Sequence, residues 1–202
     1  MSATPLQILD LGGEILLFQR LIPAQQCQQV IATAEKVGFE EAQILMGTVD
    51  HSVRGGGVLR FDPQDPRQAT MRQILLQATQ TIQIVLYQHY GIRFPAIENF
   101  SILRYRVGEG YRRHVDNLLL ASRQMELAQG IPTRDVSLVG YLNEDFQGGE
   151  TYFDRQGVKV TPRTGDVVVF PALPTTPIPM PPCPWCRVLN MPLPLGYSID
   201  GR

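Results

Sequence analysis

His114 and Asp116 lie two residues apart in a strand-like segment over 103–116, and their types and spacing point to metal chemistry. Side chains at positions i and i+2 of a strand share one face, so the imidazole and the carboxylate would enter the same space. Mononuclear non-haem Fe(II) sites combine two His with one carboxylate and keep further positions open. The pair therefore predicts two of three ligands. The third should be a His further along the chain, but no His follows His114.

The elements that must position this pair form a helical half followed by a strand-rich half. Apolar residues recur at helical spacing in two early segments, and each segment ends at a glycine. Later segments carry alternating or continuous apolar residues, which are typical of strands. The sequence predicts strands within 8–21, helices from Pro23 to Gly38 and from Asp65 to Gly91, an irregular loop over 46–62, and strands within 99–107, 136–143, 151–153 and 165–170.

This order of elements predicts a mostly β fold with flanking helices, in the α+β class. The helices would pack outside a sheet sandwich or jelly roll, whose mouth can hold a ligand. Residues 118–129 are apolar and helix-prone, and they allow two interpretations. A surface helix on the barrel is the preferred one, and a lid over the mouth is the alternative.

Three ordered motifs between Tyr105 and Phe170 resemble those of the Fe(II) and 2-oxoglutarate dependent dioxygenases of the prolyl 4-hydroxylase type. The first matches Y-x-x-G-x-x-Y-x-x-H-x-D, through Tyr105, Gly108, Tyr111, His114 and Asp116. The second resembles Y-L-N-x-x-F-x-G-G-E-T, through Tyr141, Asn143, Phe146, Gly148, Gly149, Glu150 and Thr151. The third resembles P-x-x-G-D-x-V-x-F, through Pro162, Gly165, Asp166, Val168 and Phe170. An H-x-D pair alone is weak evidence, since a lone His in a strand is usually structural, but three motifs in order are much stronger.

The resemblance implies a double-stranded β-helix (jelly roll) and an oxidoreductase that hydroxylates a prolyl or other protein or small-molecule C–H bond. His114 and Asp116 would be catalytic metal ligands, and Tyr105 and Tyr141 would bind the cosubstrate. For each tyrosine, core packing with a satisfied hydroxyl is an equal alternative. Gly148 and Gly149 are better interpreted as a tight turn. The implied cofactors are Fe(II), 2-oxoglutarate and O2, with ascorbate as a reductant.

The chain departs from this family after about Ala172. The family continues with the distal His ligand and then a Lys or Arg that anchors 2-oxoglutarate, whereas this chain continues with a Pro-rich segment. Nine of its sixteen Pro lie between Pro171 and Pro194. Proline lacks the donor that a sheet ladder needs, so we expect the C-terminal strands to be missing or disordered. An incomplete site and barrel predict a chain that is inactive or poorly folded.

A shift of reading frame explains the tail, as a hypothesis. When the codons from Pro177 onward are regrouped one base out of phase, three junctions are fixed: Met180–Pro181 gives Ala, Trp185–Cys186 gives Val and Met191–Pro192 gives Ala. The other junctions leave a choice of base. A permitted choice spells H-P-H-A-S-L-P-V-V-S-G-V-K-Y-A-F-A-T-W-L-F-D and then a stop. This string contains the family's distal His and its Lys, and the phase change would lie near Ala172 or Leu173.

Two other classes of function stay open. The first is a non-catalytic β-helix binding module that has lost its metal site. The second is a zinc or redox protein built on Cys183 and Cys186, although no second Cys or His pair stands at zinc-site spacing. With three Cys in total, a disulfide framework is not expected. The Pro-rich run could also serve as a ligand for an aromatic groove, but it lacks charged flanks.

Composition narrows the partners. The formal net charge of -1 gives no electrostatic reason to expect nucleic acid or a membrane surface. We expect a protein or small-molecule substrate, and Arg112 and Arg113 would favour an acidic one unless they are simply solvated. No basic leader or long apolar run is evident, so a cytoplasmic protein is expected. The domain prediction is a supporting part over 1–95, a dioxygenase core over 96–172 and an aberrant tail over 173–202, in one folded domain.

Overall fold

The computed structural model describes residues 5–42, 54–91, 99–114, 134–172, 178–180, 187–190 and 193–194. Two α-helices occur in these residues, α1 (Ala24–Val37) and α2 (Ala69–Tyr90), and the 3₁₀ turn η2 (Pro66–Gln68) leads into the second. The strands are β1 (Gln7–Asp10), β2 (Leu16–Gln19), β3 (Glu40–Glu41), β4 (Gly57–Arg60), β5 (Ser101–Arg104), β6 (Tyr111–His114), β7 (Arg134–Tyr141), β8 (Thr151–Phe153), β9 (Val158–Val160), β10 (Val167–Pro171), β11 (Ile178–Met180), β12 (Arg187–Asn190) and β13 (Leu193–Pro194).

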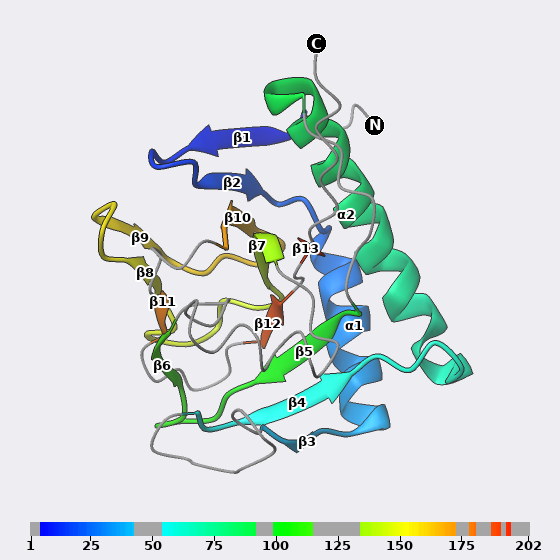
Figure 1. The fold of residues 1–202 in the computed structure, drawn as a ribbon. Helices are drawn as coiled ribbons and strands as arrows, with labels where there is room; N and C mark the ends of the chain where they lie inside the picture. The colour runs from blue at the N-terminus through cyan, green and yellow to red at the C-terminus, as the bar shows by residue number, and fades with distance from the viewer. Residues whose placement is uncertain are drawn as a thin grey trace, which may run out of the picture.

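The strands form one large sheet and two small ones. The large sheet has nine strands in the order β1-β2-β10-β7-β12-β5-β4-β3, with β13 paired to β7. The small sheets are the antiparallel pairs β11-β6 and β8-β9. Helices α1 and α2 cover one side of the large sheet, and the small sheets lie on its other side (Figure 1). The predicted β-rich fold with outer helices is confirmed.

Alternation along the strands divides the apolar residues into two layers. On β10, Val167 and Val169 join a cluster with the helices, whereas Val168 and Phe170 point to the opposite face. We call the second layer the barrel interior. Its buried members are Ile15, Leu17, Ala42, Val58, Leu103, Tyr105, Val139, Tyr141, Phe153, Val160, Val168 and Phe170. Both faces of the large sheet therefore carry buried apolar residues, and both faces are covered by other parts of the protein.

Both helices are confirmed within a few residues of the predicted bounds, and a 3₁₀ turn over Pro66–Gln68 forms the start of the second one. The Asp65 carboxylate accepts a hydrogen bond of 2.9 Å from the Arg67 backbone N–H, which caps the turn that opens the second helix. At its other end, the Gly91 N–H donates to the Tyr87 carbonyl at 2.8 Å. Helix α1 likewise stops at Gly38. Its Cys27 is buried and free, and burial raises the pKa of this thiol to about 12.

The loop predicted over 46–62 is wrong in its second part, because β4 occupies Gly57–Arg60. Val58 and Leu59 are both buried, one on each face of the sheet, and β4 pairs with β5 and β3. The glycine run obscured this strand, although only its last glycine belongs to β4. The apolar insert at 118–129 lies outside the described residues.

The expectation that the tail supplies no strands is also corrected. Strand β12 lies between β5 and β7 in the large sheet, with Leu189 opposite both Ile102 and Gly140. It contains no proline, so it offers every N–H that a central strand needs. Strand β13 pairs with β7, and its proline follows a register irregularity. A high proline content over a segment does not exclude short proline-free strands within it.

The Gly165–Asp166 step ties the sheet to the connection before α1. Gly165 donates to the Tyr141 carbonyl at 2.8 Å and accepts from the Ile22 N–H at 3.1 Å. The Asp166 carboxylate accepts a 2.8 Å hydrogen bond from the Arg20 N–H. Gly165 has a φ of 85°, and a Cβ there would collide with the Ile22 carbonyl oxygen. This third motif is therefore structural, and it holds the end of β7 in place.

The two sheet layers, closed around one interior and flanked by helices, make a double-stranded β-helix. This agrees with the fold that the family resemblance implies. In the part of the chain that the structure describes, neither helix combines the length and apolar character that a membrane span requires.

Candidate active site

His114 is the last residue of β6 and is partly exposed. Its Nδ1 lies 2.8 Å from the Arg112 carbonyl oxygen, and a carbonyl can only accept, so Nδ1–H is the donor. The neutral ring then carries its lone pair on Nε2, the atom through which such a His binds a metal. The hydrogen bond that fixes the ring thus also leaves Nε2 free to bind a metal.

An aromatic stack holds the His114 ring from one side. The Tyr111 ring lies parallel to it, with centroids 3.6 Å apart and an interplanar angle of 20°. The Arg54 guanidinium carbon lies 4.7 Å from the Tyr111 ring centroid. The same two segments are joined by a 2.9 Å hydrogen bond from the Gly55 N–H to the Gly110 carbonyl. Tyr111 in turn packs against the barrel interior, so the stack connects His114 to that layer.

Tyr141 and Thr151 form a polar pair inside the barrel. The two hydroxyl oxygens are 2.6 Å apart, and both residues are fully buried. They come from β7 and β8 and sit among apolar side chains. Tyr141 was predicted as a site residue, but Thr151 was not. The alternation of β8 offered a signal for it, since Thr151 and Phe153 share the inward face.

Tyr105 also lies in the barrel interior, with 2% of its surface exposed. A Cβ on Gly56 would come within 3.0 Å of its ring, so the glycine allows close approach of the β4 edge. Tyr105 and Tyr141 therefore both lie in the barrel interior, and the partly buried Tyr111 packs against it. Burial agrees with both a cosubstrate role and core packing, and the role of Tyr105 stays a prediction.

Ser137 adds another polar group to this layer. It is fully buried on β7, on the same alternating face as Val139 and Tyr141, and its Oγ has no hydrogen-bond partner among the residues that the structure describes. An unpaired buried hydroxyl costs free energy, which makes it a candidate to contact a bound molecule. Outside the interior, Gly148 and Gly149 adopt positive φ angles and Glu150 pairs with Lys159 at 3.9 Å, as expected for a turn with a solvated carboxylate.

The residues that the structure describes do not by themselves form a metal site. Asp116 lies outside the described residues, as do Cys183 and Cys186. Within the described ranges, no group of three His, Cys, Asp or Glu could hold a metal ion. The whole sequence has three His, and none follows His114. His114 has a hydrogen bond that leaves Nε2 available to a metal, but the described residues alone do not fit a three-ligand iron centre.

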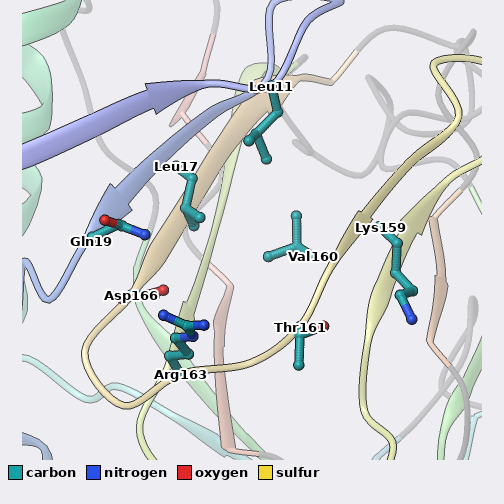
Figure 2. A pocket seen from close by; sticks show the side chains of 8 residues that line it. All are labelled: Leu11, Leu17, Gln19, Lys159, Val160, Thr161, Arg163 and Asp166. Atoms are coloured by element: carbon teal, nitrogen blue, oxygen red, sulfur yellow. The ribbon is translucent and has the colours of Figure 1, made fainter.

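A cavity of about 190 Å³ opens between the β1–β2 hairpin and the segment from β9 to β10 (Figure 2). Leu11, Leu17 and Val160 form its apolar part, and Asp166 and Arg163 lie together at one end. Burial raises the pKa of Asp166 above its ordinary value. None of the predicted site residues lines this cavity, and its acidic group is already engaged by the Arg20 backbone. It is not the candidate site.

Residues 100–177 match the family model of the 2OG-Fe(II) oxygenase superfamily. A prolyl 4-hydroxylase relative from Acanthamoeba polyphaga mimivirus is 26% identical over 155 residues, which cover 76% of this chain and 59% of the relative. The chain thus spans less than two thirds of that relative's length.

Solved structures share the fold. The crystal structure of a Pseudomonas putida prolyl-4-hydroxylase matches with a TM-score of 0.70 at 22% identity, over 92% of this chain and 94% of the other. A Trichoplax adhaerens prolyl hydroxylase, solved with a hypoxia inducible factor peptide fragment, matches with a TM-score of 0.72 at 15% identity, over 90% of this chain and 84% of the other. At these identities the likeness concerns the architecture, and it confirms the double-stranded β-helix.

Proposed function

Because the chain is, over residues 100–177, a prolyl 4-hydroxylase-type member of the 2OG-Fe(II) oxygenase superfamily, we propose that its function is 2-oxoglutarate-dependent hydroxylation of a prolyl residue in a peptide or protein. The observation that carries this proposal is the buried Tyr141–Thr151 hydroxyl pair, together with the His114–Tyr111 stack that packs against the same interior layer. The Trichoplax adhaerens structure, with its bound peptide, supports a peptide substrate.

The residues of this chain would bind and shield the cosubstrate. Two hydroxyls that already meet at 2.6 Å can both turn their O–H groups toward one carboxylate, which is a charge-assisted hydrogen bond. Phe153 and Phe170 meet edge to face at 4.9 Å in the same layer and help to exclude water. In a chain with a completed ligand set, His114 would be one of the residues that hold Fe(II), and the metal would supply the oxidation chemistry. Ascorbate as the reductant is part of the proposal, on family resemblance alone.

This chain is expected to be inactive, since its tail lacks the third ligand and the basic anchor for 2-oxoglutarate. The test compares the full chain with a restored chain, in which the residues from 177 onward are replaced by the out-of-phase string. Succinate is measured with Fe(II), 2-oxoglutarate, ascorbate and a proline-rich peptide. We expect turnover only in the restored chain, with a raised KM for 2-oxoglutarate after Tyr141→Phe.

Two results would contradict this proposal. A restored chain that folds but forms no succinate, with or without peptide, would remove the enzymatic function. Succinate formed by the unrestored chain, with its sequence verified by mass spectrometry, would show that the missing ligand is not needed. Resequencing the gene across the codons for Phe170 to Leu195 decides independently whether the frame is shifted.

A binding module without catalysis is the second candidate. The observation in its favour is that β12 completes the large sheet between β5 and β7 although the ligand is missing. This alternative predicts a folded chain whose peptide binding does not depend on iron or 2-oxoglutarate.

A further inference from the structure

Strand β1 forms an open edge of the large sheet. It is the last strand in the sheet order, and β2 is its only partner among the described strands (Figure 1). An edge strand presents backbone N–H and C=O groups that can pair with another chain. The opposite edge differs, because β3 is two residues long and both residues are exposed glutamates, which protect an edge by their charge. Strand β1 is longer, and its only charged residue is Asp10 at its end.

The alternation of the β1–β2 ladder identifies the backbone groups at this edge. Leu11 continues the register of the two strands, and its N–H donates to the Ile15 carbonyl at 2.9 Å. Along an antiparallel strand, residues that bond to the partner strand alternate with residues that face away from it. Leu9 therefore faces β2, whereas Ile8 and Asp10 direct their N–H and C=O groups away from β2.

The side chains along this edge favour strand pairing. Ile8 packs on the helix side of the sheet and Leu9 on the barrel interior, and both stay partly exposed. Leu6, which precedes the strand, has 39% of its surface exposed. The Asp10 carboxylate accepts a 2.8 Å hydrogen bond from the Gly12 N–H, so it turns back toward its own chain. The strand has neither the lysine nor the proline that commonly protects a free edge.

A second copy of this chain fits the edge in one register. A twofold axis perpendicular to the sheet at Ile8 places Ile8 opposite its equivalent and Leu6 opposite Asp10 of the second copy. All the outward backbone groups of these three residues are then paired. A shift by two residues would bring Leu6 to Gly12, whose N–H is already bonded to the Asp10 carboxylate. The two Asp10 carboxylates lie at opposite ends of the paired strands, so no like charges lie opposite each other.

Helix α2 adds no electrostatic repulsion to this arrangement. It packs on the same side of the sheet as Ile8, so a twofold axis perpendicular to the sheet keeps both copies of α2 on one side. Between Arg72 and His89 the helix has no charged residue. Its exposed side chains recur at helical spacing and are amides or apolar groups: Gln73, Gln77, Gln80, Ile84 and Tyr87.

We propose that β1 is a dimerisation edge, at which two copies of this chain pair their β1 strands antiparallel and join their large sheets into one. A closed twofold pairing covers both free edges at once. An extended peptide from another protein would leave the edge open whenever the peptide is absent. The inference does not depend on the proposed function, because it concerns none of the residues of the candidate active site.

The experiment measures the dissociation constant of the dimer by sedimentation equilibrium, with the full 202-residue chain and its variants at low salt. Leu6→Asp places a like charge opposite Asp10, and Leu6→Lys places an opposite charge there. Each pair occurs twice in the dimer, so the dissociation constant of Leu6→Asp should exceed that of Leu6→Lys about tenfold or more. High salt should reduce this difference.

Two further variants test the register. Adding Asp10→Asn to Leu6→Asp should restore association, because it removes the repulsion and keeps a side-chain oxygen for the Gly12 N–H. The matched control is Val107→Asp, which places the same charge on a residue that is 78% exposed between β5 and β6. It should leave the dissociation constant unchanged.

Circular dichroism and thermal unfolding confirm that each variant is folded before its sedimentation is interpreted. A parent chain that stays monomeric at every accessible concentration overturns the proposal, even if it binds an extended peptide along β1. A dimer with equal dissociation constants for the two Leu6 variants also overturns it, as does a dimer that Val107→Asp weakens as much as Leu6→Asp. Failure of the Asp10→Asn rescue overturns the register.

Discussion

The barrel interior and the region around His114, at the end of β6, differ in how many of their expected side chains are present. In the interior, Tyr141 and Thr151 pair their hydroxyls within a closed apolar layer. At the other end, His114 has its tautomer fixed, but Ile178 stands opposite it and no further His follows in the chain. The packing of the interior and the residues around His114 are therefore separable features of this fold.

The physical reason lies in how each region is encoded. The interior depends on alternation along several strands, and any inward residue of suitable size satisfies much of it. A metal site depends on single residue types at single positions. A change confined to the tail can therefore alter one such position while the backbone of β12 still completes the sheet.

The largest expected effect on the free energy of unfolding concerns Gly165. It tests whether contacts outside the C-terminal tail stabilise the barrel interior. Gly165→Ala should destabilise the fold by about 3 kcal/mol or more, because it adds left-handed strain and a collision with the Ile22 carbonyl. Urea unfolding measures the change. Gly157→Ala is the matched control, since Gly157 also has a positive φ but nothing within 4 Å of an added Cβ. It should cost about 1 kcal/mol.

Equal losses in the two glycine variants would contradict this prediction. That result would mean that the Gly165 step does not anchor the connection before α1, and that the interior owes its order to something else. The barrel interior would then not be stabilised separately from the region around His114.

The next effect concerns the hydroxyl pair. Tyr141→Phe and Thr151→Val should each cost about 1–2 kcal/mol, because each leaves its partner buried without that hydrogen bond. The double variant should cost less than the sum, since it removes both polar groups. Urea unfolding of all four chains gives the coupling energy. Strict additivity would show that the two hydroxyls do not act together.

A smaller, pH-dependent effect comes from Asp166. Burial raises the pKa of this carboxyl in the folded protein above its unfolded value of 3.8. The protonated form is then favoured by folding, so this contribution to stability is full below the unfolded pKa and is lost as the pH rises through the folded pKa. Asp166→Asn should remove this loss. Unfolding free energies of both chains, measured from pH 3 to 7, should show the parent falling relative to the variant, and a constant difference would contradict the prediction.

Much of the fold could be predicted because its signals are local. The Asp65 cap, the glycine at 91 and the apolar spacing between them define α2 without tertiary information. Tyr141 could be predicted as an interior residue through its motif. These features depend on neighbours in sequence, and the structure changed their boundaries by only a few residues.

Other features needed the three-dimensional pairing. Short strands such as β4 and β12 have little pattern of their own and exist because longer strands provide a ladder for them. Thr151 becomes a candidate only when β8 brings it against Tyr141. The place opposite His114 is set by the register of β11, which no spacing in the sequence reveals.

The smallest expected effect bears most directly on the metal end. His114→Ala should change the unfolding free energy by less than about 1 kcal/mol, because the ring is partly exposed, and water can replace its hydrogen bond to the Arg112 carbonyl when the stack on Tyr111 is lost. A lone structural His in a strand would cost more, about 2 kcal/mol or above, since its removal would disturb packing around it. Urea unfolding of this variant beside Tyr141→Phe decides between the two. A large loss at His114 would make it part of the scaffold, and the contrast between a packed interior and a dispensable, ligand-type residue at the other end would no longer hold.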